Sequence, residues 1–153
     1  MILATRFGPA RATINESGAL EAFGFGDSQW RARGDSPVLA TQLREYCEGA
    51  RTAFQLELNL CGTEFQVRVW QELCRISFGS AITYAELARR VERPGAARAV
   101  GRANATNPIW LIVPCHRVLG SDGNLTGYAY GLRIKECLLE WEGLRIKATC
   151  KNL

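Results

Sequence analysis

Two capping boxes and two prolines divide the middle of this chain into three short helices. Segments 63–66 (T-E-F-Q) and 83–86 (T-Y-A-E) each place a threonine three residues before a side chain that can bond back to the first turn, which predicts two helix starts. Pro94 breaks the second helix. A third helix begins near Gly95 and ends before Asn107-Pro108, because a residue that precedes a proline is disfavoured in the helical region. The second and third helices have the spacing of a helix-turn-helix.

The third helix is rich in small residues and carries two arginines one turn apart, Arg98 and Arg102. Small side chains keep the helix slender, which suits a close approach to a nucleic-acid backbone, and the second half of the chain holds the whole positive excess behind the net charge of +4. Tight packing between helices and a solvated basic face would explain the same features. The placement of the two arginines favours DNA.

The first 58 residues predict a small unit of strands and one helix. Residues 1–26 alternate loosely between apolar and polar, which is typical of short antiparallel strands. Residues 27–36 indicate a loop, 37–47 a helix that stops at Gly49, and 54–58 a strand with period-two alternation. We therefore predict an α+β fold with an N-terminal domain over 1–58, a linker over 59–62 and a mostly helical C-terminal domain over 63–153.

The composition is that of an ordinary globular protein, with 47% hydrophobic and 22% charged residues in 153. The first residues lack a leader pattern and no apolar stretch reaches membrane-spanning length, so we expect an intracellular protein, cytoplasmic or, in a eukaryote, nuclear. Six cysteines without a C-x-x-C pair, and a single histidine, argue against a zinc site or a redox dithiol. We expect free thiols that serve mostly as small core residues.

The segment 112–120 (I-V-P-C-H-R-V-L-G) sets Cys115 beside His116, the only histidine, and Arg117. Both neighbours favour the thiolate, the reactive form of cysteine, although a buried inert thiol is the commoner case. The apolar run 109–113 predicts a buried extended segment that leads to Cys115. Adjacent residues of an extended segment point to opposite sides, which argues against a Cys–His hydrolase. It leaves coupling through a water, with a carboxylate such as Glu142 holding the imidazole.

Six separated motifs occur in this chain in the order and spacing of one known family. They are T-Y at 83–84, A-A-R-A-V-G at 96–101, N-P at 107–108, P-C-H-R-V at 114–118, the glycine-tyrosine loop at 127–131 and L-L-x-x-E-G at 138–143. From about residue 57 to 144 the chain resembles the O6-alkylguanine-DNA alkyltransferases, and before that only the strand-rich character agrees. The resemblance implies an RNase H-like N-terminal sheet and a monomer without cofactor or metal that binds the minor groove of duplex DNA. It also implies that an O6-alkylated (methylated) guanine is flipped out and that its alkyl group is transferred to a cysteine, once per molecule.

The same resemblance assigns roles to individual side chains. Cys115 is the alkyl acceptor, His116 acts through a water and is oriented by Glu142, and Asn107 braces the active-site turn. Tyr84 donates a proton or hydrogen bond to guanine N3, and Arg98 fills the place that the base leaves in the stack. The remaining DNA contacts are Thr83, Ala97 and Arg102, and the remaining residues of the base pocket are Val118, Tyr128, Ala129, Tyr130 and Lys135. Carbonyls of Cys115 and Val118 and the amide of Ala129 would select guanine.

Tyr130 stands where many relatives have glycine, which predicts a tighter pocket that reacts poorly with O6-benzyl groups relative to O6-methyl groups. Ser77-Phe78 replaces a common Pro-Tyr pair. Two other functions compete with alkyl transfer. A non-reactive alkyltransferase-like protein that binds DNA lesions shares the fold but lacks the acceptor, so Cys115 argues against it. A transcription-factor module with an incidental thiol leaves the 114–118 turn and the Tyr128 loop unexplained.

Overall fold

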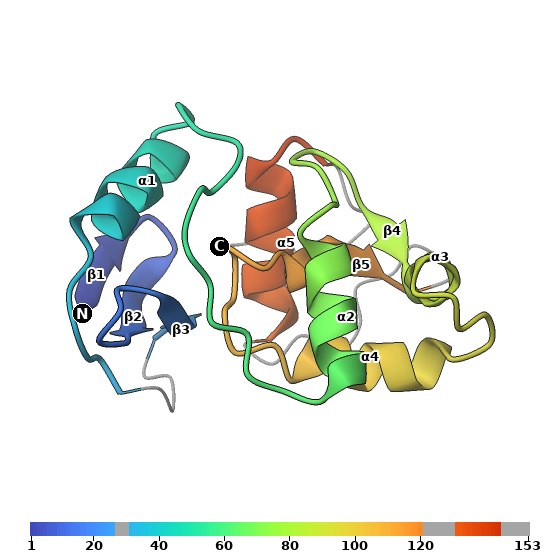
Figure 1. Ribbon diagram of the computed structural model, residues 1–153. Coiled ribbons are helices and arrows are strands. Elements are labelled where there is room, and N and C mark those ends of the chain that lie inside the picture. The colour runs from blue at the N-terminus through green and yellow to red at the C-terminus, as the bar shows by residue number, and fades with distance from the viewer. Residues whose placement is uncertain (27–30, 121–130, 145–153) are drawn as a thin grey trace. The chain divides into compact units, whose positions relative to one another are not determined.

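The computed structural model describes residues 1–26, 31–120 and 131–144 of the chain, and Figure 1 shows its mixed α/β architecture. The chain divides into two compact units, one formed by residues 1–61 with 108–112 and the other by residues 62–107 with 113–153. The segment 108–112 thus groups with the N-terminal unit although it follows the central helices in sequence. In the described ranges, no helix is both long and apolar enough to cross a bilayer.

The first unit contains a three-stranded antiparallel sheet, as the alternation over 1–26 predicted. Strands β1 (Ile2–Thr5), β2 (Gly8–Ile14) and β3 (Leu20–Phe25) lie in the order β1-β2-β3. Gly8 has a φ of +107°, which only glycine adopts easily, at the turn between the first two strands. Alternate residues of β2 are buried, and Phe23 and Phe25 of β3 meet edge to face at 5.6 Å between ring centroids.

Helix α1 (Pro37–Cys47) has the bounds that the sequence predicted. Ser36 caps it by accepting from the Leu39 amide, and proline follows the cap at the first helical position, where its missing N–H costs nothing. The helix ends as Gly49 turns into the left-handed region, with the Ala50 amide donating to the Glu45 carbonyl at 2.8 Å. In Figure 1, α1 lies beside the sheet of the same unit.

The prediction of a strand over 54–58 is wrong, because only Leu58 of this segment forms a β-bridge. Leu20 pairs with Leu58 through two hydrogen bonds of 2.9 Å, one to the Glu57 carbonyl and one from the Asn59 amide. Further along, the side chain of Gln42 takes the place of a neighbouring strand. It accepts from the Gln55 amide at 2.8 Å and donates to the Gln55 carbonyl at 2.9 Å. A helix side chain therefore satisfies the backbone that a sheet ladder would have used.

The run 109–113 is buried as predicted, but it is extended only at its start. Ile109 forms a single parallel bridge with Phe23, and the chain then turns through residues 110–112. Leu111 has a φ of +67°, and the Ile112 amide donates back to the Trp110 carbonyl at 2.7 Å. A continuous apolar run fixes burial but does not distinguish a strand from a buried turn.

The second unit is built on helices α2 (Glu64–Leu73), α3 (Tyr84–Arg90), α4 (Ala97–Ala105) and α5 (Leu132–Trp141). Helix α4 packs against both α2 and α3. Thr63 and Gln66 form the predicted reciprocal capping box of α2. Thr83 caps α3 by accepting from the Glu86 amide, but the return bond is not made, because the Glu86 carboxylate is bound by two arginines instead.

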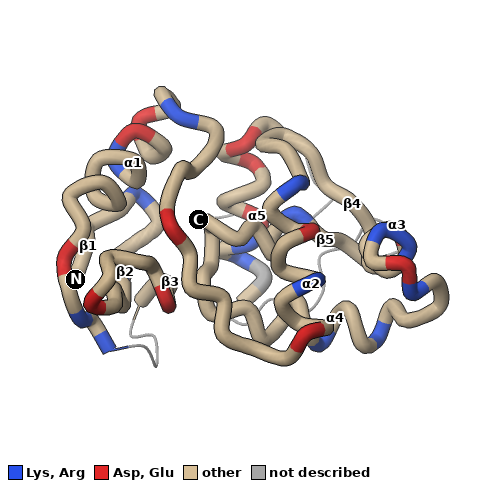
Figure 2. Tube along the Cα trace, viewed as in Figure 1, with Lys and Arg blue, Asp and Glu red and all other residues tan. Residues whose placement is uncertain are grey.

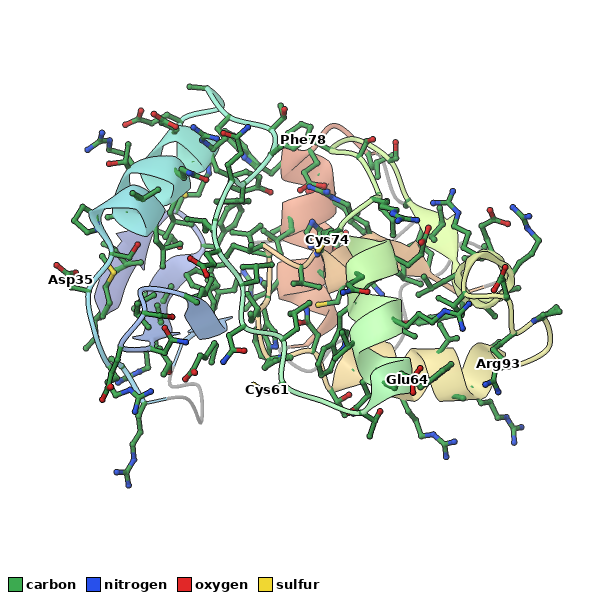
Figure 3. All side chains as sticks on the ribbon, in the orientation of Figure 1. Asp35, Cys61, Glu64, Cys74, Phe78 and Arg93 are labelled. Atoms are coloured by element: carbon green, nitrogen blue, oxygen red, sulfur yellow. The ribbon has the colours of Figure 1, made fainter. Side chains whose placement is uncertain are left out.

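Helix α3 ends before Pro94 is reached. Glu92 lies in the left-handed region with a φ of +59°, and the Arg93 amide donates to the Ala88 carbonyl at 2.9 Å. This is a Schellman end, in which glycine is the usual residue, with glutamate in its place. Figure 3 labels Arg93 in the resulting turn between α3 and α4, and Glu64 and Cys74 at the two ends of α2.

Candidate active site around Cys115

Cys115 begins a single turn of 3-10 helix, Cys115–Arg117, so it does not lie in the extended segment that the sequence predicted. The turn follows Pro114, and the Arg117 amide donates to the Pro114 carbonyl at 3.1 Å. The Cys115 side chain is only 2% exposed. Of the other cysteines in the described ranges, Cys61 and Cys74 are exposed, and Cys47 and Cys137 half-buried, so the expectation of mostly buried thiols was wrong. Within that part of the chain Cys115 is the one fully buried thiol.

His116 is fully buried and is held by Glu142. Its Nε2 lies 3.0 Å from the Glu142 Oε1, so the carboxylate accepts and the Nε2 carries the proton. Burial lowers the pKa of His116, more than the hydrogen bond and charge of Glu142 raise it, so the ring is neutral. Nδ1 is then a hydrogen-bond acceptor, and it has no partner among the described residues. Neither ring nitrogen is bonded to Cys115.

Arg117 fixes Glu142 from the other side. Its Nε and Nη2 donate to the two carboxylate oxygens, each at 2.8 Å, and its Nη1 donates to the Ile76 carbonyl at 2.6 Å. Burial opposes ionisation of Glu142, but the hydrogen bonds from His116 and Arg117 and the charge of Arg117 lower its pKa to about 2. The carboxylate is therefore charged whenever the protein is folded near neutral pH. Glu142 is the C-cap of α5, where Gly143 turns the chain with a φ of +90°.

Two amides near the end of α4 hold the turn that carries Cys115. Asn107 donates to the Val113 carbonyl at 2.9 Å, and Asn104 donates to the Cys115 carbonyl at 3.3 Å. Both side chains are 2% exposed. Asn107 belongs to the predicted site, whereas Asn104 does not. The signal that could have found Asn104 is an asparagine inside a helix, where it is unfavourable unless its side chain has a specific partner.

Tyr84 reaches the site through a short parallel pair of strands, β4 (Ile82–Thr83) and β5 (Val118–Leu119). Thr83 pairs with Leu119, so Tyr84 follows β4 directly, while buried Val118 opens β5 just beyond the 3-10 turn. The ammonium of Lys135 lies 5.9 Å from the centre of the Tyr84 ring. Burial lowers the pKa of Lys135 to about 8, although the charge of Cys115 acts in the opposite direction. The buried amine of Lys135 therefore interacts electrostatically with Cys115.

Helix α4 presents its arginines to solvent. Arg98 and Arg102 are exposed, Thr83 and Ala97 half-buried, and no carboxylate of the described chain pairs with either arginine. Figure 2 shows the basic positions along α3, the following turn and α4. Arg89 and Arg90 are bound by Glu86, whose pKa their hydrogen bonds lower to about 2, and Glu92 binds Arg68. Carboxylates therefore neutralise part of the arginine cluster seen in the sequence, and the uncompensated positive charge at this surface includes Arg98 and Arg102 of α4.

The predicted pocket residues Tyr128, Ala129 and Tyr130 lie outside the described residues. The described part of the site holds a buried thiol that interacts electrostatically with Lys135, a neutral histidine whose Nδ1 has no partner there, and a charged pair that fixes the histidine. Such a site can form and protect a thiolate.

Residues 64–144 match the family described as 6-O-methylguanine DNA methyltransferase, DNA binding domain. A methylated-DNA–protein-cysteine methyltransferase of Mycobacterium leprae is 57% identical over 102 residues, which are 67% of this chain and 62% of that protein. One of Methanosarcina mazei is 51% identical over 71% of this chain and 69% of its own length. A crystal structure of Mycobacterium tuberculosis OGT in complex with DNA superposes with a TM-score of 0.85 and 40% identity, covering 92% of this chain and 90% of that one.

Proposed function

This chain belongs to the O6-methylguanine DNA methyltransferase family, and we propose that it repairs DNA by moving an alkyl group from the O6 of guanine to its own Cys115. The observation that carries the proposal is the buried Cys115 in a turn shared with His116 and Arg117, both bound to Glu142. A hydrolase would need a base bonded to the thiol, and the His116 ring nitrogens are not.

The reaction exchanges one carbon–oxygen bond for one carbon–sulfur bond. The thiolate of Cys115 attacks the alkyl carbon, the bond to guanine O6 breaks, and the purine takes up one proton as it leaves. The Tyr84 hydroxyl supplies that proton or a hydrogen bond at N3, and the Lys135 ammonium, 5.9 Å from the centre of its ring, stabilises the phenolate that proton transfer leaves. Because no group in the site can cleave a thioether, each molecule acts once.

DNA binding is assigned to α3 and α4, acting as a helix-turn-helix in the minor groove. Exposed Arg102 neutralises a phosphate, and Arg98 enters the base stack where the guanine has been flipped out. Thr83 and Ala97 lie near the starts of these two helices, where backbone amides can meet the DNA backbone. Half-buried Ala97 leaves room for that approach.

The flipped base is read by backbone groups and by residues of the segment 127–131. The carbonyls of Cys115 and Val118 accept from the exocyclic amine, and the Ala129 amide donates to O6. Tyr128 and Lys135 complete the pocket, and Tyr130 narrows it toward small alkyl groups. The protein acts as a monomer without a cofactor or metal, and in the cytoplasm or nucleus, where DNA is found.

We assign this chemistry to the domain over 63–153, joined by the linker 59–62 to an RNase H-like domain over 1–58. The alternative, a lesion-binding protein that does not react, is disfavoured because the acceptor is present as Cys115.

The test is to incubate the full chain with a duplex that contains one O6-methylguanine and to map the tryptic peptides by mass spectrometry. We expect one methyl group on the Cys115 peptide, in proportion to the duplex added up to one equivalent. An unmodified duplex and Cys115→Ser should give none. A Cys115 peptide that stays unmodified in the native protein would refute the proposal.

A further inference from the structure

The side chain of Asn104 is oriented by one hydrogen bond and unsatisfied at its other end. Nδ2 donates to the Cys115 carbonyl at 3.3 Å, which fixes the amide, because a flipped amide would set two oxygens against each other. Oδ1 is buried and has no partner in the part of the chain that the structure describes. Buried amide oxygens are nearly always satisfied, so this one indicates a donor that the described residues do not supply.

His116 supplies a second unsatisfied atom on the next residue. Its Nε2 donates to Glu142, so the bare Nδ1 is an acceptor, and it too has no partner within the described ranges. The peptide unit between Cys115 and His116 is thus linked to two unsatisfied acceptors. One is Oδ1 of Asn104, which is bonded to the Cys115 carbonyl, and the other is Nδ1 of His116 itself. Two acceptors cannot bond to each other. A water can satisfy both, because it brings two hydrogens and still has lone pairs for a third partner.

We propose that Asn104 is a positioning residue for activation of the thiol, holding together with His116 the water through which Cys115 loses its proton. This inference rests on the proposed function. The water donates one hydrogen to Asn104 Oδ1 and one to His116 Nδ1, and accepts the Cys115 S–H. The thiol proton passes to the water as the water gives one to Nδ1. The products are a thiolate and an imidazolium, which the charged Glu142 stabilises.

Asn104 fixes the orientation of the water, which His116 alone cannot do. A water bonded only to Nδ1 can rotate about that bond, and then its lone pairs do not stay on the sulfur. A second bond from the same water to Oδ1 removes this rotation. The Nδ2 bond to the Cys115 carbonyl keeps the acceptor at a fixed place relative to the cysteine backbone. Asn104 is in α4, so the helix that carries Arg98 and Arg102 also supports the thiol.

The test compares Asn104→Leu, which keeps the size of the side chain but has no polar group, with Val100→Ala as the control. Val100 is a fully buried residue of the same helix with no polar contact to the site, so its truncation loosens α4 without touching the water. The rate of carboxamidomethylation of Cys115 by iodoacetamide is measured from pH 5 to 10 on the full chain without DNA. The exposed Cys61 and Cys74 serve as internal references.

We expect the midpoint of the Cys115 profile to rise by about one pH unit in Asn104→Leu, with about a tenfold slower reaction at pH 7, while Val100→Ala keeps the wild-type profile. A wild-type profile for Asn104→Leu, or an equal shift in Val100→Ala, overturns the inference. If Asn104→Leu does not fold, Asn104→Ala takes its place under the same criteria. Methyl transfer from the O6-methylguanine duplex is measured in parallel. Its failure in the wild type would refute the proposed function, while the iodoacetamide profile would still decide the role of Asn104.

Discussion

Glu142→Gln removes one charge from a buried network without changing its shape. The carboxylate accepts hydrogen bonds from His116 Nε2 and Arg117 Nη2 on one oxygen and from Arg117 Nε on the other. A glutamine oxygen can keep the first two. Its NH2 group then faces the Arg117 Nε–H, donor against donor, and the guanidinium is left buried without a countercharge, bonded only to the glutamine oxygen and the Ile76 carbonyl among the described residues.

The expected loss of stability in Glu142→Gln follows from those contacts. The side chains of Arg117 and Glu142 are 8% and 0% exposed, so water cannot replace the lost charge. Removing one partner of a buried pair costs about 3 to 5 kcal/mol, because the other charge stays buried without compensation. For a chain of this length that corresponds to a Tm lower by about 10 °C. Arg117→Met in the same chain removes the stranded cation, so the double variant should recover part of the loss.

The assay is urea denaturation followed by circular dichroism, with Glu92→Gln as the matched control. Glu92 forms an exposed pair with Arg68 at 2.7 Å, so the same chemical change should cost less than about 1 kcal/mol there. Equal losses of stability for Glu142→Gln and Glu92→Gln, or a double variant as unstable as the sum of its parts, would show that the network does not stabilise the fold.

Lowering the pH should also reduce the free energy of unfolding. With a pKa near 2 in the folded state, Glu142 contributes stability that is present above its unfolded pKa and is lost as pH falls toward 2.

Three further outcomes are expected. Lys135→Met should abolish a rise in the free energy of unfolding between about pH 8 and 10. In that window the unfolded lysine binds more protons than the folded one, whose pKa is about 8; equal pH slopes in urea titrations of the two proteins would contradict this. Gly101→Ala should stabilise the chain by about 0.5 to 1 kcal/mol, because a Cβ there would lie 3.8 Å from the Tyr84 ring, an ordinary contact; a lower Tm would show that the ring cannot accept it. Methylation of Cys115, 2% exposed, should overpack its site by about 1 to 3 kcal/mol, and an unchanged or higher melting temperature after reaction would rule this out.

Local signals in this sequence predicted local structure well. The bounds of α1 follow from Ser36, Pro37 and Gly49, and the start of α2 from the reciprocal bonds of Thr63 and Gln66. Each of these features is decided by residues within one helical turn. Period and capping rules therefore suffice for them.

The errors arose where distant side chains decide the backbone. Gln42 occupies the hydrogen-bonding groups of Gln55, and no pattern in 54–58 could show that the partner would be a helix. The run 109–113 is apolar throughout, so its turn at Leu111 left no periodic signal.

The site itself was only partly predictable. Cys115, His116 and Glu142 were found through motifs, but the contribution of Asn104 depends on two unsatisfied acceptors that exist only in three dimensions.

The contacts of Arg117 also set a constraint on the order of events during folding. Its guanidinium joins the Ile76 carbonyl, 41 residues earlier, to Glu142, 25 residues later. Contacts over such separations are slow to form, because the intervening chain must first be brought together. A growing polypeptide in which residue 142 has not yet left the ribosome holds Cys115 without the carboxylate that orients its histidine. Glu142 can therefore hold the ring of His116 only after residue 142 has been synthesised and brought to the turn that carries Cys115.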